Sequence, residues 1–246
     1  MTLPRFPIAF DDGQVALAVR AHTDADLPRS LRAMGLTTGV PTLVPVSAGS
    51  RPAQLSRLRA LLEKVVVAVA EAVDATVVDE GDRDGVGALL GQVRRHKKAG
   101  FPLVGVAAEG EGREELDSEH THFVLVPTDS GADRARWIST VATAVSGGNR
   151  SVALVAAGGE PAWEAVAAHV RAGRLVMAVG RSGGVADHLA AALAGQPADG
   201  RARSLAATGQ VCALDPGRGA SSVADMVRTA LSRPNALNPG RSPSGR

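Results

Sequence analysis

Short runs of β-branched and aliphatic residues alternate with longer helical patterns along most of this 246-residue chain, and this alternation restricts the possible folds more than any other feature. It is typical of strand–helix–strand units, in which the strands pair in parallel and the helices cover the sheet. We therefore expect an α/β fold of the Rossmann-like type, with three layers (α/β/α) and a mainly parallel sheet.

The apolar residues between positions 54 and 73 recur at spacings of three and four, which predicts a helix with one buried face. The expected strands are residues 14–20, 42–46, 75–79, 102–107, 123–126, 152–157, 175–179 and 211–214. The other expected helices are residues 25–34, 84–98, 132–146, 161–172, 185–195 and 221–232. The segment 195–210 is rich in alanine, glycine and arginine, and we expect it to be a surface loop.

The chain is long enough for one large domain with its own core. We expect a single domain over residues 1–232. Residues 233–246 are rich in proline, glycine, serine and asparagine and hold almost no core-forming side chains, so the sequence predicts a disordered tail there.

Composition excludes several classes of protein. Cys212 is the only cysteine, so no intramolecular disulfide can form, and its side chain is expected to be an inert part of a late strand. Apolar runs such as 65–70 are far shorter than the roughly 20 residues of a membrane span. The N-terminus does not resemble a secretory signal, so we expect a cytoplasmic protein that does not bind membranes. With a net charge of +2, four phenylalanines, two tryptophans and no tyrosine, nucleic acid is not an expected partner.

Four expected strand–helix junctions are rich in glycine. In parallel sheets, ligands bind at the carboxyl ends of strands, where helix N-termini present unpaired N–H groups. A phosphate-bearing small molecule would explain these glycines, and so would the steric needs of tight turns. The candidate ligand-binding residues are Gly49 and Ser50; Gly81, Asp82, Arg83, Asp84 and Gly85; Gly158, Gly159 and Glu160; and Gly180, Arg181, Ser182, Gly183, Gly184 and Asp187. We expect them to converge on one edge of the sheet.

The segment from Leu116 to Val126, LDSEHTHFVLV, resembles a segment of the N-terminal SLOG region of melastatin-type TRP (TRPM) channels and of its stand-alone prokaryotic (LSDAT) relatives. The likeness extends to residues 42–50, 77–86, 153–159 and 180–187, so it covers about residues 14–193. It implies a SLOG fold and a nucleotide-derived ligand related to NAD or ADP-ribose. No channel activity is implied, because the transmembrane part has no counterpart here.

The chain departs from the family pattern at two of these turns. Glu80-Gly81 stands where the family usually has two glycines, which puts an acid beside the expected anion site. Gly184 stands where the family has an arginine, and Arg181 lies three residues earlier, from where it can reach a phosphate.

Two functions remain open, beside the plain possibility of a scaffold that has lost its ligand. The first is a ligand sensor that reports the presence of a nucleotide-derived molecule to a separate effector protein or within a homo-oligomer. The second is a phosphoribohydrolase or nucleotide N-glycosidase, because SLOG relatives of the lysine-decarboxylase-like type carry a glutamate where this chain has Asp187. The sequence leans away from an enzyme, and we expect no bound cofactor.

Individual side chains also have plain structural explanations. Three roles are open for Asp187: a partner of a ribose hydroxyl group, a general base, or an acid that stabilises the first turn of a helix. Asp82 and Asp84 flank Arg83 and can simply pair with it, and the helix dipole accounts for Glu160. A pair of histidines, His120 and His122, is expected to be structural rather than a metal site. No nucleophile elbow, GKS or GKT phosphate loop or HExxH pair is present, so no catalytic residue is assigned.

Overall fold

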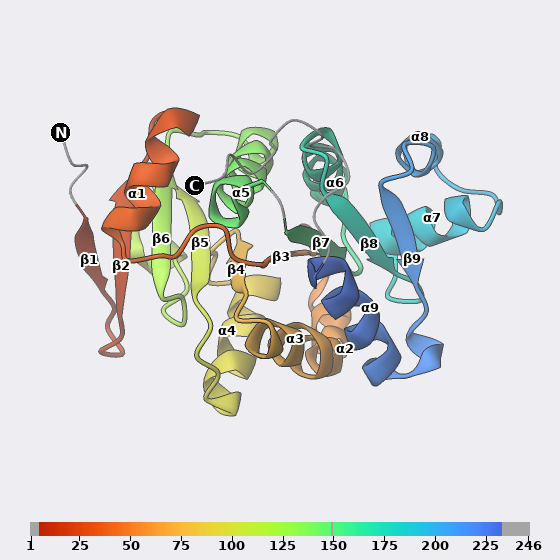
Figure 1. Ribbon diagram of the computed structural model, residues 1–246, viewed down its shortest axis with the longest axis horizontal. Coiled ribbons are helices and arrows are strands. Elements are labelled where there is room, and N and C mark those ends of the chain that lie inside the picture. The colour runs from red at the N-terminus through yellow and green to blue at the C-terminus, as the bar shows by residue number, and fades with distance from the viewer. Residues whose placement is uncertain (1–4, 149, 233–246) are drawn as a thin grey trace, which may run out of the picture.

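In the computed structural model, which describes residues 5–148 and 150–232, nine strands form one continuous sheet (Figure 1). The strands are β1 (Phe6–Ala9), β2 (Val15–Arg20), β3 (Thr42–Val46), β4 (Thr76–Asp79), β5 (Leu103–Ala108), β6 (His122–Val126), β7 (Ser151–Val155), β8 (Leu175–Val179) and β9 (Val211–Leu214). Their order is β1-β2-β6-β5-β4-β3-β7-β8-β9, and every neighbouring pair is parallel except β1 and β2.

Helices cover both faces of this sheet. The α-helices are α1 (Leu27–Ala33), α2 (Pro52–Leu61), α3 (Ala68–Ala72), α4 (Val86–Lys97), α5 (Gly131–Ser146), α6 (Pro161–Arg171), α7 (Gly184–Leu193), α8 (Gly200–Ala206) and α9 (Ala220–Ser232). A π-helical segment, η2 (Leu62–Val67), joins α2 to α3, and η1 (Asp24–Asp26), η3 (Arg113–Glu115) and η4 (Pro216–Arg218) are short 3₁₀ turns. The expected helix over 54–73 is thus one continuous run of α2, η2 and α3.

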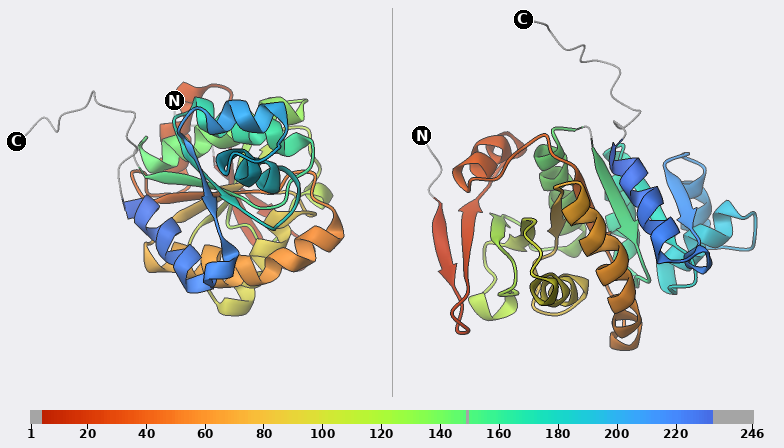
Figure 2. Two further views of the ribbon diagram at one scale, coloured as in Figure 1. Left: turned by 90° about the vertical axis from the view of Figure 1, so that its right-hand side faces the viewer. Right: turned by 60° about the horizontal axis from the view of Figure 1, so that its bottom comes forward.

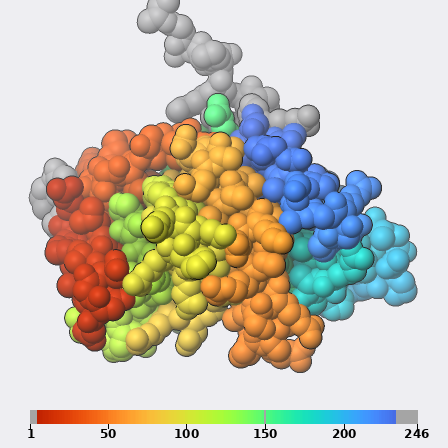
Figure 3. All heavy atoms as spheres, turned by 90° about the horizontal axis from the view of Figure 1, so that it is seen from below, coloured from red at the N-terminus to blue at the C-terminus, as the bar shows by residue number. Residues whose placement is uncertain are grey.

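The two helical layers enclose two separate apolar cores. Helices α1, α5, α6 and α8 lie on one face (Figure 1). Their buried residues and those of α7 form one core with the sheet. Helices α2, α3, α4 and α9 cover the opposite face (Figures 2 and 3). With η2, their buried residues form the second core. The expected three-layer Rossmann-like α/β fold is confirmed.

Two elements were not expected from the sequence. Strand β1 is only four residues long, includes Pro7, and pairs antiparallel with β2 at the edge of the sheet. All four of its residues are apolar, so its sequence does not alternate, although the exposure of its side chains does. Helix α8 lies inside the segment 195–210, so the prediction of a loop there was wrong. Its first turn is capped by Asp199, whose side chain accepts from the N–H of Arg201, but only Ala202 is buried. The helix therefore lacks the apolar periodicity by which the others were recognised.

The strand order places a topological switch point between β3 and β7. From β3 the chain moves outward through β4, β5 and β6 and then returns to place β7 on the other side of β3. In folds of this kind, ligands bind outside the carboxyl ends of the strands, near such a reversal.

The expected tail, residues 233–246, lies outside the described residues. Within them, no helix has the length and apolar character needed to cross a membrane.

Candidate functional site

The glycine turns after β3 and β7 close upon each other at the switch point. The N–H of Gly159 donates to the carbonyl of Ala48 at 2.8 Å, and the N–H of Gly158 donates to Oγ of Ser50 at 2.9 Å. A Cβ on Gly159 would collide with the carbonyl of Gly49. These glycines therefore allow the two turns to contact each other through their backbones. Their N–H groups already donate to protein atoms.

The turn after β8 is also occupied by protein groups. The first N–H groups of α7, from Val185 and Ala186, donate to the carbonyls of Gly158 and Ala157 at 3.0 Å each. Ser182 accepts from the N–H of Ala157 at 2.8 Å.

Two charged residues of these later turns, Arg181 and Glu160, pair close to the surface. Arg181 forms an ion pair with Asp215, and both side chains are more than half exposed. Glu160 pairs with Arg201 on α8, which holds the pKa of Glu160 below its usual value. Asp187 lies in the first turn of α7, and one of its carboxylate oxygens is buried without a hydrogen-bond partner in the described residues.

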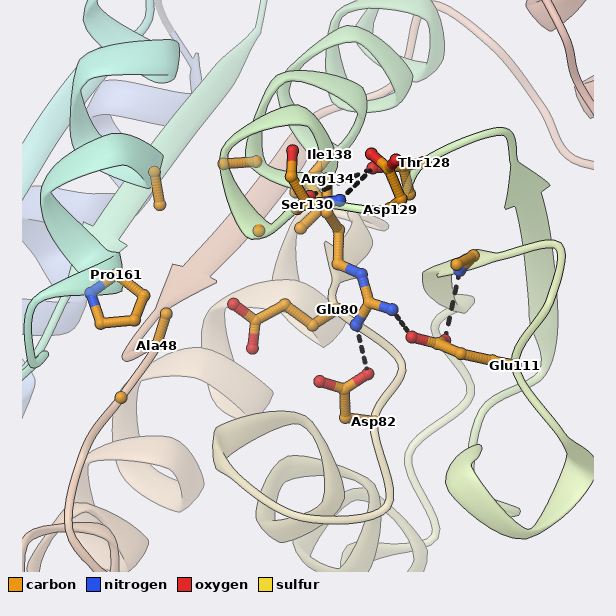
Figure 4. Close-up of a pocket in the computed structure, with 15 residues that line it drawn as sticks. Ala48, Glu80, Asp82, Glu111, Thr128, Asp129, Ser130, Arg134, Ile138 and Pro161 are labelled. Carbon is orange, nitrogen blue, oxygen red and sulfur yellow. Dashed lines mark hydrogen bonds and ion pairs between the residues drawn. The ribbon is translucent and has the colours of Figure 1, made fainter.

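A cavity of about 430 Å³ lies over the carboxyl ends of β3 to β6, beneath α5 and α6 (Figure 4). Of the residues expected to bind a ligand, it brings together Gly49 and Asp82. The turn after β7 adjoins it through Pro161, whereas the Gly180–Asp187 turn does not line it. The Gly180–Asp187 turn thus lies apart from this cavity, because β8 lies on the far side of the switch point from β4.

Arg134 is the cation at the centre of this cavity. Its guanidinium donates to Asp82, in the turn after β4, at 2.7 Å, and it also pairs with Glu111, in the loop after β5. Helix α5 carries Arg134 on its first turn, which begins with Ser130 as N-cap; the Ser130 hydroxyl accepts from the N–H of Asp133. With only 16% of its side chain exposed, Arg134 joins three segments that are distant in sequence.

Glu80, the residue after β4, points its carboxyl group into the cavity between Arg134 and the wall made by Ala48 and Pro161 (Figure 4). No hydrogen bond or ion pair to this carboxyl group is found in the part of the chain that the structure describes. Burial raises the pKa of Glu80 to about 7, with Asp82 and Asp79 adding to the rise and Arg134 opposing it.

The remaining walls are apolar on one side and rich in hydroxyl groups on the other. Ala135 and Ile138 of α5 and Ala165 of α6 form the apolar side. Thr128 and Ser130, which precede α5, supply hydroxyl groups at the mouth. A cavity of this size and mixed lining suits a small molecule with a flat apolar part and a polar or anionic part.

A buried ionic network supports the turn that carries Glu80 and Asp82. His120 is fully buried; its Nε2 lies 2.7 Å from Oδ1 of Asp79, and its Nδ1 lies 2.8 Å from Oδ2 of Asp117. Asp79 Oδ1 accepts from the N–H of Gly81, and the carbonyl of Gly81 accepts from the N–H of Asp117, both at 2.9 Å. The LDSEHTHF segment, which carries the family resemblance, therefore holds the β4 turn in place.

The network has a structural role of the kind expected for His120. The two histidines do not act together, because His122 has a different neighbour: its Nδ1 lies 2.8 Å from Oγ1 of Thr121. Burial lowers the pKa of His122. Burial also acts to lower the pKa of His120, but its two carboxylate partners outweigh burial and raise that pKa to about 10.

Two glycines of α4 make room for this network. A Cβ on Gly87 would lie 2.9 Å from Oδ2 of Asp79, and one on Gly91 would lie 2.9 Å from Oδ2 of Asp117. Gly81 itself has φ of +74°, and a Cβ there would lie 2.8 Å from Cα of Gly105. Close packing accounts for all three glycines.

Apart from Asp82, the residues that give the cavity its charge were not identified from the sequence. Glu80 was noticed only as a departure from the family, and neither Glu111 nor Arg134 was selected. A usable signal was present, since the Thr-Asp-Ser-Gly run at 128–131 follows a strand and opens a helix, as the four chosen turns do. Arg83 and Asp84, which were selected, are exposed and lie outside the cavity.

Comparison with known proteins agrees with this architecture. Residues 40–225 match the family described as "SLOG in TRPM, prokaryote". Among solved structures, the X-ray structure of a structural genomics target named TM1055 aligns with a TM-score of 0.55 and 18% sequence identity, covering 77% of this chain and 99% of the other. That likeness shows a shared fold. A comparison with curated proteins gives no match. The chain therefore belongs to the prokaryotic branch of the SLOG family found in TRPM channels.

Proposed function

We propose that this protein is a sensor domain whose ligand, an NAD-derived or ADP-ribose-like nucleotide, occupies the cavity beneath α5 and α6. Membership of the SLOG family supports a nucleotide-related role. The observation that carries the proposal is the position of Arg134, a mostly buried guanidinium at the carboxyl edge of the sheet that faces a cavity of ligand size.

The cavity offers a suitable subsite for a phosphate group. Arg134 can bind a phosphate in a bidentate manner, and the hydroxyl groups of Thr128 and Ser130 line the same cavity. The first N–H groups of the 16-residue helix α5, other than that of Asp133, which donates to Ser130, add donors and positive potential at the same mouth. The apolar wall formed by Ile138 and Ala165 suits a nucleobase.

The same contacts suggest how binding would be reported. Arg134 ties the loop that contains Glu111 to the turn that contains Asp82. A phosphate that takes over the guanidinium competes with both carboxylates, so ligand binding favours a state in which the Glu111 loop is released. That loop is partly exposed at Gly110 and Glu114 and can present the change to an effector protein or to a second copy of the chain.

Hydrolysis of a nucleotide N-glycosidic bond is the second candidate function, and Glu80 favours it. A carboxyl group in a cavity with a pKa near 7 can protonate a leaving base while water attacks the ribose carbon. The aspartate at the position of the relatives' glutamate, Asp187, does not line the cavity. Release of adenine from AMP, or of nicotinamide from NAD, would distinguish this enzyme from a sensor.

Titration calorimetry with AMP, ADP-ribose and NAD tests the proposal. We expect at least one of the three to bind the full chain, and we expect Gly131→Trp to abolish that binding. Gly131 lies at the cavity mouth, and a Cβ there meets no atom within 4 Å, so the indole fills the entrance without crowding the core. If none of the three nucleotides binds, or if the tryptophan variant binds like the parent, the proposal is wrong.

A further inference from the structure

Glu80 differs from the other acids of the cavity because it faces the interior and has no partner in the described residues. Asp82 and Glu111 are both held by Arg134. Asp129 is exposed at the rim, where water solvates its carboxylate. Glu80 is half-buried and faces the interior, and the described residues provide it with no hydrogen-bond donor.

The environment of Glu80 indicates what kind of group it would bind. Burial and the neighbouring Asp82 and Asp79 disfavour its ionised form, so its pKa rises to about 7. A second anion beside it would be repelled. A neutral donor such as a hydroxyl group relieves the lost solvation without adding charge, and two adjacent hydroxyl groups can serve both carboxylate oxygens.

The position of Glu80 in the fold agrees with this assignment. It is the residue after β4, the neighbour of β3, and the turn after β3 lies at the switch point of the sheet. In doubly wound dinucleotide-binding folds, an acid near the end of the second strand accepts from a ribose hydroxyl, while the phosphate lies at a helix N-terminus. Here the helix N-terminus beside the cavity is that of α5, with Arg134 on its first turn.

We propose that Glu80 accepts hydrogen bonds from the 2′- and 3′-hydroxyl groups of a ribose, and that the cavity thereby selects ribonucleotides over 2′-deoxyribonucleotides. This inference rests on the proposed function and adds the sugar specificity of the same site. The phosphate lies on the Arg134 side of the cavity and the sugar hydroxyl groups on the Glu80 side. The base contacts the apolar wall that includes Ile138.

The test compares AMP with 2′-deoxy-AMP by titration calorimetry, on the full chain and on Glu80→Gln. We expect the parent to bind AMP at least about tenfold more tightly than 2′-deoxy-AMP. Hydrogen bonds donated by the ribose favour the ionised form of Glu80, and a hydrogen bond to a charged group is worth more than a neutral one. The glutamine variant should lose most of that preference, since one carboxylate oxygen becomes a donor. Its melting temperature should stay close to that of the parent, because no protein contact is lost.

Glu164→Gln is the matched control, because Glu164 is an exposed carboxyl group on α6 outside the cavity, and this variant should keep the full preference for AMP. If the parent binds AMP and 2′-deoxy-AMP equally, or if Glu80→Gln keeps the preference, the inference is wrong while the proposed nucleotide site stands. If the parent binds neither nucleotide, AMP is not a ligand of the proposed site, and this inference is wrong as well.

Discussion

His120 and Asp79, 41 residues apart in sequence, form a buried ion pair with 2.7 Å between Nε2 and Oδ1, directly beneath the turn that enters the cavity. The histidine is charged at neutral pH: burial lowers its pKa, but Asp79 and Asp117 outweigh burial and raise the pKa from 6.5 to about 10. A group whose pKa is raised by folding stabilises the fold fully below its unfolded value and loses that contribution as pH rises through the folded value.

We therefore expect the free energy of unfolding to fall as pH rises from about 6.5 to about 10, with His120 responsible for much of the fall. Urea unfolding at several pH values in this window measures the slope. The variant His120→Asn, which cannot ionise, should show a clearly shallower slope. Equal slopes for parent and variant would mean that His120 is neutral in the folded protein.

Gly91 provides a test of the close packing around this network. A Cβ there would lie 2.5 Å from Cβ of Glu119 and 2.9 Å from Oδ2 of Asp117. Alanine normally stabilises a helix interior by about 1 kcal/mol relative to glycine. We expect Gly91→Ala to destabilise the protein instead, by about 1–3 kcal/mol, because overpacking outweighs propensity.

Chemical denaturation measures this effect, with Gly131→Ala as control. Gly131 also lies in a helix, but a Cβ there meets no atom within 4 Å, so its substitution should leave stability nearly unchanged. A stabilised Gly91→Ala variant would show that α4 does not pack against the network as closely as described.

Much of the fold could be predicted from sequence because it depends on local patterns. The runs at 42–46 and 175–179 correspond residue for residue to β3 and β8. The sequence did not predict β1 because that strand is short and contains a proline. It did not predict α8 because that helix has almost no buried side chains. In both cases the stabilising contacts come from neighbouring elements rather than from the segment's own pattern.

The site was only partly predictable, because strand order is not a local property. Glycine turns are visible in sequence, but their division between the two sides of β3 is not. Gly49 and Asp82 were selected and line the cavity, whereas Arg134 reads in sequence as an ordinary helix-surface charge. Its function depends on α5 lying over the turns after β4 and β5, which only the three-dimensional arrangement reveals.

Arg174 is a second buried cation, at the opposite end of the sheet, and its substitution gives a further stability prediction. Arg174 precedes β8 and donates to Oγ of Ser139 and Oγ of Ser151 at 2.9 Å each, and its Nη1 lies 2.7 Å from Nδ1 of His169. These acceptors are neutral, and burial lowers the pKa of Arg174 to about 10. We expect Arg174→Lys to cost about 3 kcal/mol, since lysine cannot reproduce the planar set of donors. Denaturant unfolding measures this cost, and Arg57→Lys, at an exposed position, is the neutral control. If both variants were as stable as the parent, this prediction would be wrong.

The sensing proposal predicts a change in dynamics. Because Glu111 is held by Arg134, a phosphate at Arg134 should weaken this tie and free residues 109–116. Hydrogen exchange followed by mass spectrometry should then show faster exchange in this segment when AMP is bound. In the Glu111→Gln variant, the amide hydrogens of residues 109–116 should exchange faster than in the parent even without AMP. Increased protection of the loop on binding would mean that the ligand closes the loop rather than releasing it.

The most direct test of the cavity as the ligand site compares two arginines by titration calorimetry with AMP. Arg134 lines the cavity, whereas Arg181 lies in the glycine-rich turn after β8 and pairs with Asp215 near the surface. Arg134→Ala should weaken binding by about 10- to 100-fold, the usual value of a hydrogen-bonded charge on phosphate, while Arg181→Ala should bind like the parent. The reverse result, with binding lost in Arg181→Ala and kept in Arg134→Ala, would move the ligand to the β8 turn and contradict the cavity as its site.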